Sequence, residues 1–195
     1  MSASDSFVPF APAPSDDVIR NRLVLAAGIA GAAFVGFGLI MWVAANWDDF
    51  SRLQKLSMVG GAFALASIAA MAHAALRIPG ALIAFCAMGG LFALFGQIYQ
   101  SGSDPWVLFG LWAALGLPLA LAARHDAVWL PWVVVVFTAI PLWVMTYSGQ
   151  PWPTELALAL PLWLAGAAMS AGLWLLGRWN DGEGRWAFRL SVLLN

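Results

Sequence analysis

Charged side chains are scarce in this sequence. They make up 10% of its 195 residues, whereas a soluble globular domain carries about 25%. Hydrophobic residues make up 62% of the chain, and the mean hydropathy is +0.82. A chain of this composition cannot bury most of its apolar surface in a water-soluble core, which excludes the soluble globular class.

Ionisable residues are missing altogether from the central parts of the long apolar runs, where no Asp, Glu, Lys or Arg occurs. Pumps and proton-coupled transporters usually place such groups at mid-membrane depth. Their absence disfavours coupled transport, although amides and aromatic rings could still handle a neutral solute.

Two further shortages narrow the class of protein. The net charge is −1 and the nine Lys and Arg residues are scattered, so no basic surface for nucleic acid is expected. Cysteine occurs once, as Cys86 inside an apolar run, which excludes an intrachain disulfide and indicates a packed thiol. No metal-ligand spacing accompanies His73 or His125, so we expect no cofactor and no metal.

The apolar residues gather in runs of about 20, the length at which a helix crosses about 30 Å of hydrocarbon. Barrel strands would be shorter and would alternate in polarity. The sequence therefore predicts an all-α, polytopic transmembrane helical bundle with about six spans in three hairpins. The predicted spans are 23–46, 56–76, 81–100, 105–123, 128–147 and 155–176.

The ends of the chain differ in composition from this transmembrane domain, 23–178. Residues 1–22 combine prolines and aspartates with small residues, which predicts a disordered tail. Residues 179–195 are too short to span, so they form a cytoplasmic tail, an interfacial helix or the start of a truncated seventh span.

Helix ends can also be predicted. Asp49 or Ser51 suits the cap of the second span, and Asp104 followed by Pro105 suits the start of the fourth. Pro79 and Gly80 indicate a tight turn before the third span. The spans themselves carry Pro118, Pro141 and Pro161, which interrupt helices in some transporters but are ordinary in membrane helices.

Small residues mark the helix faces expected to pack. Span 81–100 has a small face and a bulky face, and we expect the small face to contact neighbouring helices and the bulky face to meet lipid. The small face holds Cys86, Gly89, Gly90, Ala93, Gly96 and Gln97; the bulky face holds Leu91, Phe92, Leu94, Phe95 and Ile98. Span 23–46 has similar rows at Gly28, Ala32 and Gly36 and at Gly31, Gly38 and Ala45. Besides the lipid bilayer, a membrane-protein partner or a second copy could pack on these faces.

Orientation follows from basic residues, which favour the cytoplasmic side. The side with both termini carries seven of them: Arg20, Arg22, Arg77, Arg124, Arg178, Arg185 and Arg189. The opposite side carries two, Arg52 and Lys55. We therefore expect a multi-pass protein of a bacterial inner membrane with both termini in the cytoplasm.

Polar and aromatic residues gather at the non-cytoplasmic ends of the spans, and they form the candidate site: Asn46, Trp47, Asp48, Gln97, Tyr99, Gln100, Asp104 and Trp106. A buried amide must find partners or water, so Gln97 and Gln100 indicate either a ligand site or an interhelical hydrogen bond that ties the third span to the first through Asn46. The acids suit either a cation or helix caps. No nucleophile stands near His125, so a hydrolytic enzyme has little support.

Two motifs resemble a known family. They are Val43-Ala44-Ala45-Asn46-Trp47-Asp48 and Phe95-Gly96-Gln97-Ile98-Tyr99-Gln100, the second followed by Asp104-Pro105-Trp106 and Leu111-Trp112. Over residues 23–123 the chain resembles a bacterial family of predicted membrane proteins, domain of unknown function 2157. The resemblance implies a polytopic bacterial membrane protein without an established biochemical role. Family members often begin with a soluble helical segment and have more spans, so an abbreviated member is expected.

These observations favour a non-catalytic integral inner-membrane protein, structural or accessory, with a ligand or partner site on its non-cytoplasmic face. A small-solute transporter or channel is the alternative, and an intramembrane enzyme comes third. No nucleic-acid partner is expected.

Overall fold

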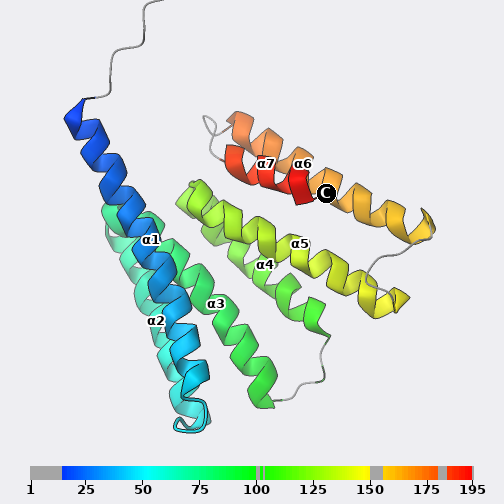
Figure 1. Cartoon of the computed structure of the whole chain (residues 1–195), viewed down its shortest axis with the longest axis horizontal. Coiled ribbons are helices and arrows are strands. Elements are labelled where there is room, and N and C mark those ends of the chain that lie inside the picture. Colours follow the sequence, from blue (N-terminus) through cyan, green and yellow to red (C-terminus); the bar gives the residue numbers. More distant parts are fainter. Residues whose placement is uncertain (1–14, 100–101, 103, 150–155, 180–183, 195) are drawn as a thin grey trace, which may run out of the picture.

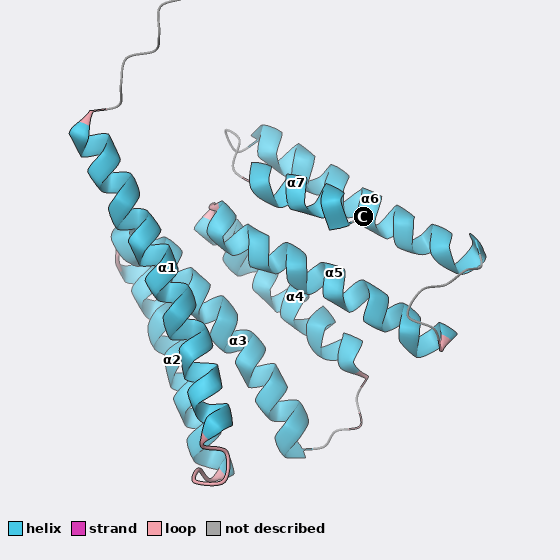
Figure 2. Ribbon diagram, viewed as in Figure 1, coloured by secondary structure: helices cyan, strands magenta, loops and turns pink. Residues whose placement is uncertain are grey.

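The computed structural model describes residues 15–99, 102, 104–149, 156–179 and 184–194. Its described elements are all helices (Figure 2). They are α1 (Asp16–Ala45), α2 (Arg52–Ala72), the 3-10 turn η1 (Ala74–Leu76), α3 (Arg77–Tyr99), α4 (Pro105–Ala123), α5 (Asp126–Ser148), α6 (Leu156–Trp179) and α7 (Arg185–Leu194). The predicted all-α bundle is confirmed.

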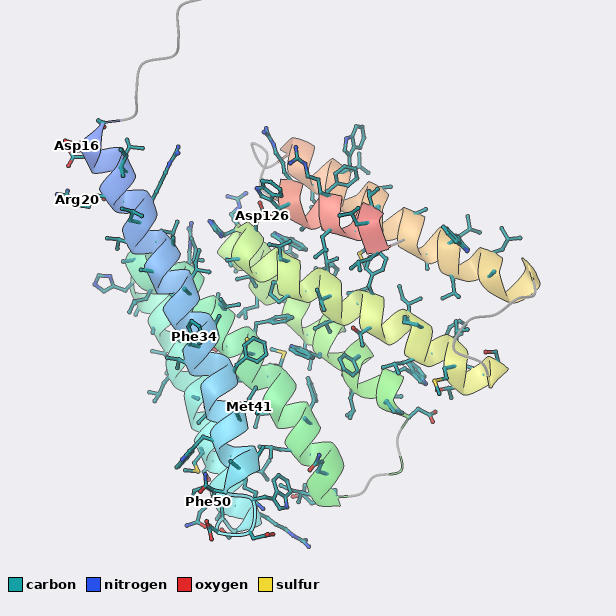
Figure 3. The ribbon with its side chains drawn as sticks, viewed as in Figure 1. Asp16, Arg20, Phe34, Met41, Phe50 and Asp126 are labelled. Carbon is teal, nitrogen blue, oxygen red and sulfur yellow. The ribbon has the colours of Figure 1, made fainter. Side chains whose placement is uncertain are left out.

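Five of these helices are long and apolar enough to cross a membrane: α1, α2, η1 with α3, α4 and α5. They match the first five predicted spans. The sixth predicted span falls on α6, whose described apolar stretch covers Leu162–Gly177. Along α1 large apolar side chains point away from the bundle, as Phe34 and Met41 do at 79% and 67% exposure (Figure 3). Such side chains are typical of a helix that meets lipid.

The first helix begins earlier than predicted. Residues 16–22, assigned to a disordered tail, form the first turns of α1, and residues 1–14 lie outside the described part of the chain. Asp16 and Asp17 stand in the first turn, where carboxylates favour the positive end of the helix dipole. Arg20 also pairs with Asp17 at 3.1 Å. These local interactions extend the helix beyond the apolar run.

The turn between α2 and α3 also lies elsewhere than predicted. The chain turns at His73 and η1, while Pro79 and Gly80 already belong to the first turn of α3. Proline is tolerated there because its missing N–H has no helical acceptor. A Cβ on Gly80 would lie 2.9 Å from the carbonyl oxygen of Ala66 and 3.1 Å from Ala70 Cβ. Glycine at this position therefore lets α2 and α3 approach closely, and it does not make the turn.

The bundle is built around α3, which contacts α1, α2, α4 and α5 (Figure 1). Within the apolar window of η1 and α3 56% of the residues are buried, against 11% for α1. The helices joined at the end of the bundle where α1 begins, α2 with α3 and α4 with α5, make the most extensive contacts. In contrast, α1 and α2 contact each other far less than either contacts α3.

The two predicted faces of α3 are only partly reproduced. Cys86, Gly89 and Gly90 are buried, as expected of the small face. Leu94, placed on the lipid face, is also buried and packs with Val43 of α1 in a second core cluster. Because neighbours surround α3 on several sides, a simple division into a packed face and a lipid face fails.

Some of the small residues of α1 allow close packing on α3, and others do not contact another helix. Gly36 is so close to α3 that a Cβ on it would lie 2.9 Å from Cys86 Cβ, whereas Gly31 and Gly38 have open space. In the row of Gly28, Ala32 and Gly36, the last two residues are therefore packed inside the chain, while a Cβ on Gly28 would also have no neighbour within 4 Å. Association of a partner or a second copy through the open row stays a prediction.

Between α3 and α4, aromatic rings lie against glycines in both directions. The ring of Trp112 on α4 covers Gly89 of α3, where a Cβ would lie 2.4 Å from the ring. Conversely, Phe85 of α3 covers Gly116 of α4, where a Cβ would lie 2.5 Å from the ring. The rings of Phe85 and Trp112 are 5.2 Å apart between centroids. The two helices are therefore fitted to each other by shape.

Indole hydrogen bonds connect three helices. Trp112 Nε1 donates to the Phe85 carbonyl oxygen at 3.0 Å, joining α4 to α3. Trp132 Nε1 donates to the Ala113 carbonyl oxygen at 2.8 Å, joining α5 to α4. These bonds satisfy two indole N–H groups that would be costly to leave unpaired in an apolar environment.

Replacing Trp132 by phenylalanine keeps an aromatic ring but removes the bond from α5 to α4. We expect a loss of about 1 kcal/mol, the usual net value of such a bond, measured as a lower midpoint of thermal unfolding in detergent. Trp163→Phe is the matched control because Trp163 is 60% exposed. Equal midpoints for the two variants would contradict the role of the bond.

The last helix, α7, packs on the bundle. It contacts α5 and α6, and Ala187 and Ser191 are fully buried while Trp186 and Leu193 are exposed. Ser191 Oγ lies 3.0 Å from Ser170 Oγ of α6. Within the C-terminal segment 179–195, residues 185–194 thus form a short helix docked on α5 and α6.

Candidate functional site

The structure divides the predicted site into separate places. Trp47, in the turn after α1, and Gln97, on the last turn of α3, line the same groove, which has a volume of about 260 Å³. Its lining comes from α1, the turn after it and α3, with Val59 from α2. Its lining consists of Ile40, Val43, Ala44, Trp47, Val59, Gly90, Ala93, Leu94 and Gln97. We call this space the α1–α3 groove.

Asn46 does not reach Gln97. Its Nδ2 donates to the carbonyl oxygen of Trp42 at 2.8 Å, within its own helix. The backbone N–H of Asn46 bonds to the same oxygen, so this residue caps the C-terminus of α1. Of the two predicted partners of Asn46, Gln97 is not bonded to it, and its exposed amide lies at the groove; Gln100 lies outside the described residues, so a bond from it to Asn46 stays a prediction.

Three other predicted residues lie at helix ends or in a loop. Asp48 is exposed in the turn after α1. Tyr99 is 55% exposed and its ring lies 4.5 Å from that of Phe95 on the same helix. Asp104 occupies the N-cap position of α4 as predicted, although its side chain makes no cap bond. Gln100 lies outside the described residues.

Trp106 belongs to a different pocket. It lies with α5 and α6 residues around a space of about 280 Å³, lined by Trp106, Gly110, Ala139, Ile140, Trp143, Leu162 and Ala165. Its indole Nε1 is buried and has no hydrogen-bond partner among the described atoms. Trp47 and Trp106 therefore do not form one aromatic cluster.

Lys55 is the residue that the sequence interpretation missed. It is 5% exposed, and its Nζ lies 3.6 Å from the centroid of the Trp47 ring. A cation over the face of tryptophan is attracted by the negative face of the ring. The lysine thus joins α2 to the end of α1 at the ring that lines the α1–α3 groove.

The start of α2 explains this placement. Ser51 Oγ accepts a hydrogen bond from Gln54 N, and the Gln54 side chain accepts one from Ser51 N, which is a complete capping box. The helix therefore begins at Arg52, and Lys55 lies inside it, in the first turn after its N-terminus. The predicted span began at residue 56 and left Lys55 in a loop. Ser51-x-x-Gln54 was the available signal.

The remaining polar groups have structural partners or face solvent. His125 is the N-cap of α5, and its Nδ1 accepts a hydrogen bond from Ala127 N at 3.1 Å. Asp49, like Asp48, is exposed. In the described residues no three His, Cys, Asp or Glu side chains come close enough to hold a metal ion.

Comparison with known proteins gives one match. The family model described as "Predicted membrane protein (DUF2157)" matches residues 8–129. This range includes α1 to α4 and hence the whole α1–α3 groove. No curated protein and no solved structure matches.

Proposed function

Because the chain belongs to this family of predicted membrane proteins, we propose that it is a non-catalytic integral inner-membrane protein that binds a ligand or partner at its non-cytoplasmic face. The α1–α3 groove is the binding place, and Gln97 and the ring of Trp47 form its polar and aromatic end. The proposal assigns no reaction to the protein.

The distribution of basic residues supports this orientation. Arg20, Arg77 and Arg124 lie at the helix ends on the side of the start of α1, and all three are exposed. The groove residues Trp47 and Gln97 lie at the opposite helix ends. Since basic residues favour the cytoplasmic side, the groove would open toward the non-cytoplasmic surface.

One observation carries the proposal. Two residues from distant parts of the sequence, Trp47 and Gln97, line one groove whose other walls are apolar. Sites for small molecules typically combine apolar walls with a few polar groups. A residue whose role is only structural would be expected to use its amide for a bond inside the protein, and Asn46 shows that arrangement at the end of α1.

Thiol labelling tests the proposal. We expect Gln97→Cys in a Cys86→Ser background to react with a membrane-impermeant thiol reagent from the non-cytoplasmic side of oriented vesicles. His73→Cys is the control for the cytoplasmic side, because His73 is exposed between α2 and α3. No labelling of the Gln97→Cys variant from either side, with His73→Cys labelled, would refute the proposed site.

The same experiment addresses the alternative of a small-solute transporter or channel. Labelling of position 97 from both sides would favour an alternating or open pathway. Helices α4 and α5 continue through Pro118, Pro131 and Pro141. Broken helices, which expose backbone groups to substrate in many transporters, are thus not formed at these prolines, and we prefer the binding function.

A further inference from the structure

The described walls of the α1–α3 groove are mostly apolar, and the ring of Trp47 at its aromatic end also contacts the ammonium of Lys55, which is not itself among the lining residues. We infer that the groove holds an acyl chain of an anionic lipid, with the lipid head group beside the ammonium of Lys55. This inference rests on the proposed binding function and names its ligand class.

The charge of Lys55 is the first argument. The side chain is 5% exposed, and the described residues give its ammonium the Trp47 ring but no carboxylate. Buried charges in proteins are usually paired. Its position one turn inside the N-terminal end of α2 adds the unfavourable field of the helix dipole. An anion beside Lys55 would supply the missing counter-charge and would offset the unfavourable interaction with the helix dipole.

The walls of the groove are the second argument. Among the described lining residues Gln97 is the only amide, and the others include Ile40, Val43 and Leu94. An apolar chain with a charged end fits this arrangement better than a compact polar solute does.

The route of entry favours a lipid over a free anion. Asp48 and Asp49 are exposed in the turn next to Trp47, so their carboxylates repel an anion that approaches through water. A lipid enters from the side, through hydrocarbon. Ala44 and Ala93, one on each helix, are exposed and line the groove, so their small side chains leave space for an acyl chain.

Native mass spectrometry of the full-length protein in a mild detergent tests the inference. The probes are dioleoyl phosphatidylglycerol and dioleoyl phosphatidylcholine, which share their acyl chains and differ in net charge. We expect one phosphatidylglycerol to bind about tenfold more tightly than phosphatidylcholine, as a charge-assisted contact implies. Lys55→Met should remove this preference, and Arg52→Met, a change of an exposed cation on the same helix, should retain it.

A second variant separates chain from head group. Ala93→Leu fills the groove and should weaken both lipids, whereas Ala122→Leu, at an exposed position of α4, should weaken neither. An unchanged preference in Lys55→Met, unchanged binding in Ala93→Leu, or displacement of the lipid by inorganic phosphate would overturn the inference. If the Gln97→Cys variant is labelled from the non-cytoplasmic side in that case, the proposed function stands and only the lipid is wrong.

Discussion

Replacing Gly89 by alanine is expected to destabilise the protein by about 2 kcal/mol, the usual cost of adding atoms to a packed core. The new Cβ would lie 2.4 Å from the ring of Trp112. The ring cannot easily move aside, because its Nε1 bonds to the Phe85 carbonyl oxygen and it also packs against the rings of Phe85 and Phe109. Thermal unfolding in detergent should show a midpoint lower by roughly 4–8 °C.

Gly38→Ala supplies the matched control for this substitution. Gly38 also lies inside a membrane helix, and a Cβ on it would have no neighbour within 4 Å. Alanine favours helix over glycine, so this variant should be as stable as the original or slightly more stable. If both variants unfold at the same temperature, the fit between α3 and α4 contributes less than the structure indicates.

Trp47→Leu is expected to cost about 2 kcal/mol, because it removes the ring that faces the ammonium of Lys55, a residue that is only 5% exposed. Lys55→Met alone should be nearly neutral or stabilising, since a buried charge is replaced by an apolar side chain of similar length. With methionine at position 55, Trp47→Leu should lose only packing. Unfolding midpoints in detergent are measured for the original protein, the two single variants and the double variant. The difference between the effect of Trp47→Leu with lysine and with methionine at position 55 is the coupling energy of the two residues.

The expected coupling is about 2 kcal/mol, as for a desolvated cation on an aromatic ring. Phe50, which packs on Trp42 at 5.1 Å between centroids, offers a control for a general effect of removing a ring from this turn. Phe50→Leu should therefore show no coupling to Lys55→Met. Strictly additive changes for Trp47 and Lys55 would show that the ring does not stabilise the charge.

Much of the architecture could be predicted from the sequence because lipid imposes a simple rule on each segment. Apolar runs of sufficient length indicated the positions of α1 to α5, and the small residues Cys86, Gly89 and Gly90 correctly marked a packed face of α3. Both rules act within one helix. Neither depends on which helices are neighbours.

The candidate site could be predicted only in part, since it depends on neighbours. Trp47 and Gln97 share a groove, but Trp106 lies at another pocket, because α4 turns this residue toward α5 and α6. Sequence spacing carries no information on that rotation. Lys55 was missed for a local reason: hydropathy ends a span at the first charge, whereas the capping box of Ser51 and Gln54 extends the helix past it.

The weak contact between α1 and α2 has a consequence for how the protein is made. Both helices pack mainly on α3, which is synthesised after them. At about 5–20 residues per second, the stretch from residue 45 to residue 99 takes roughly 3–11 s to synthesise. During this interval the first two spans have little protein surface to pack on, so insertion factors or lipid must shield Gly36 and the polar end of α2 until the third span arrives.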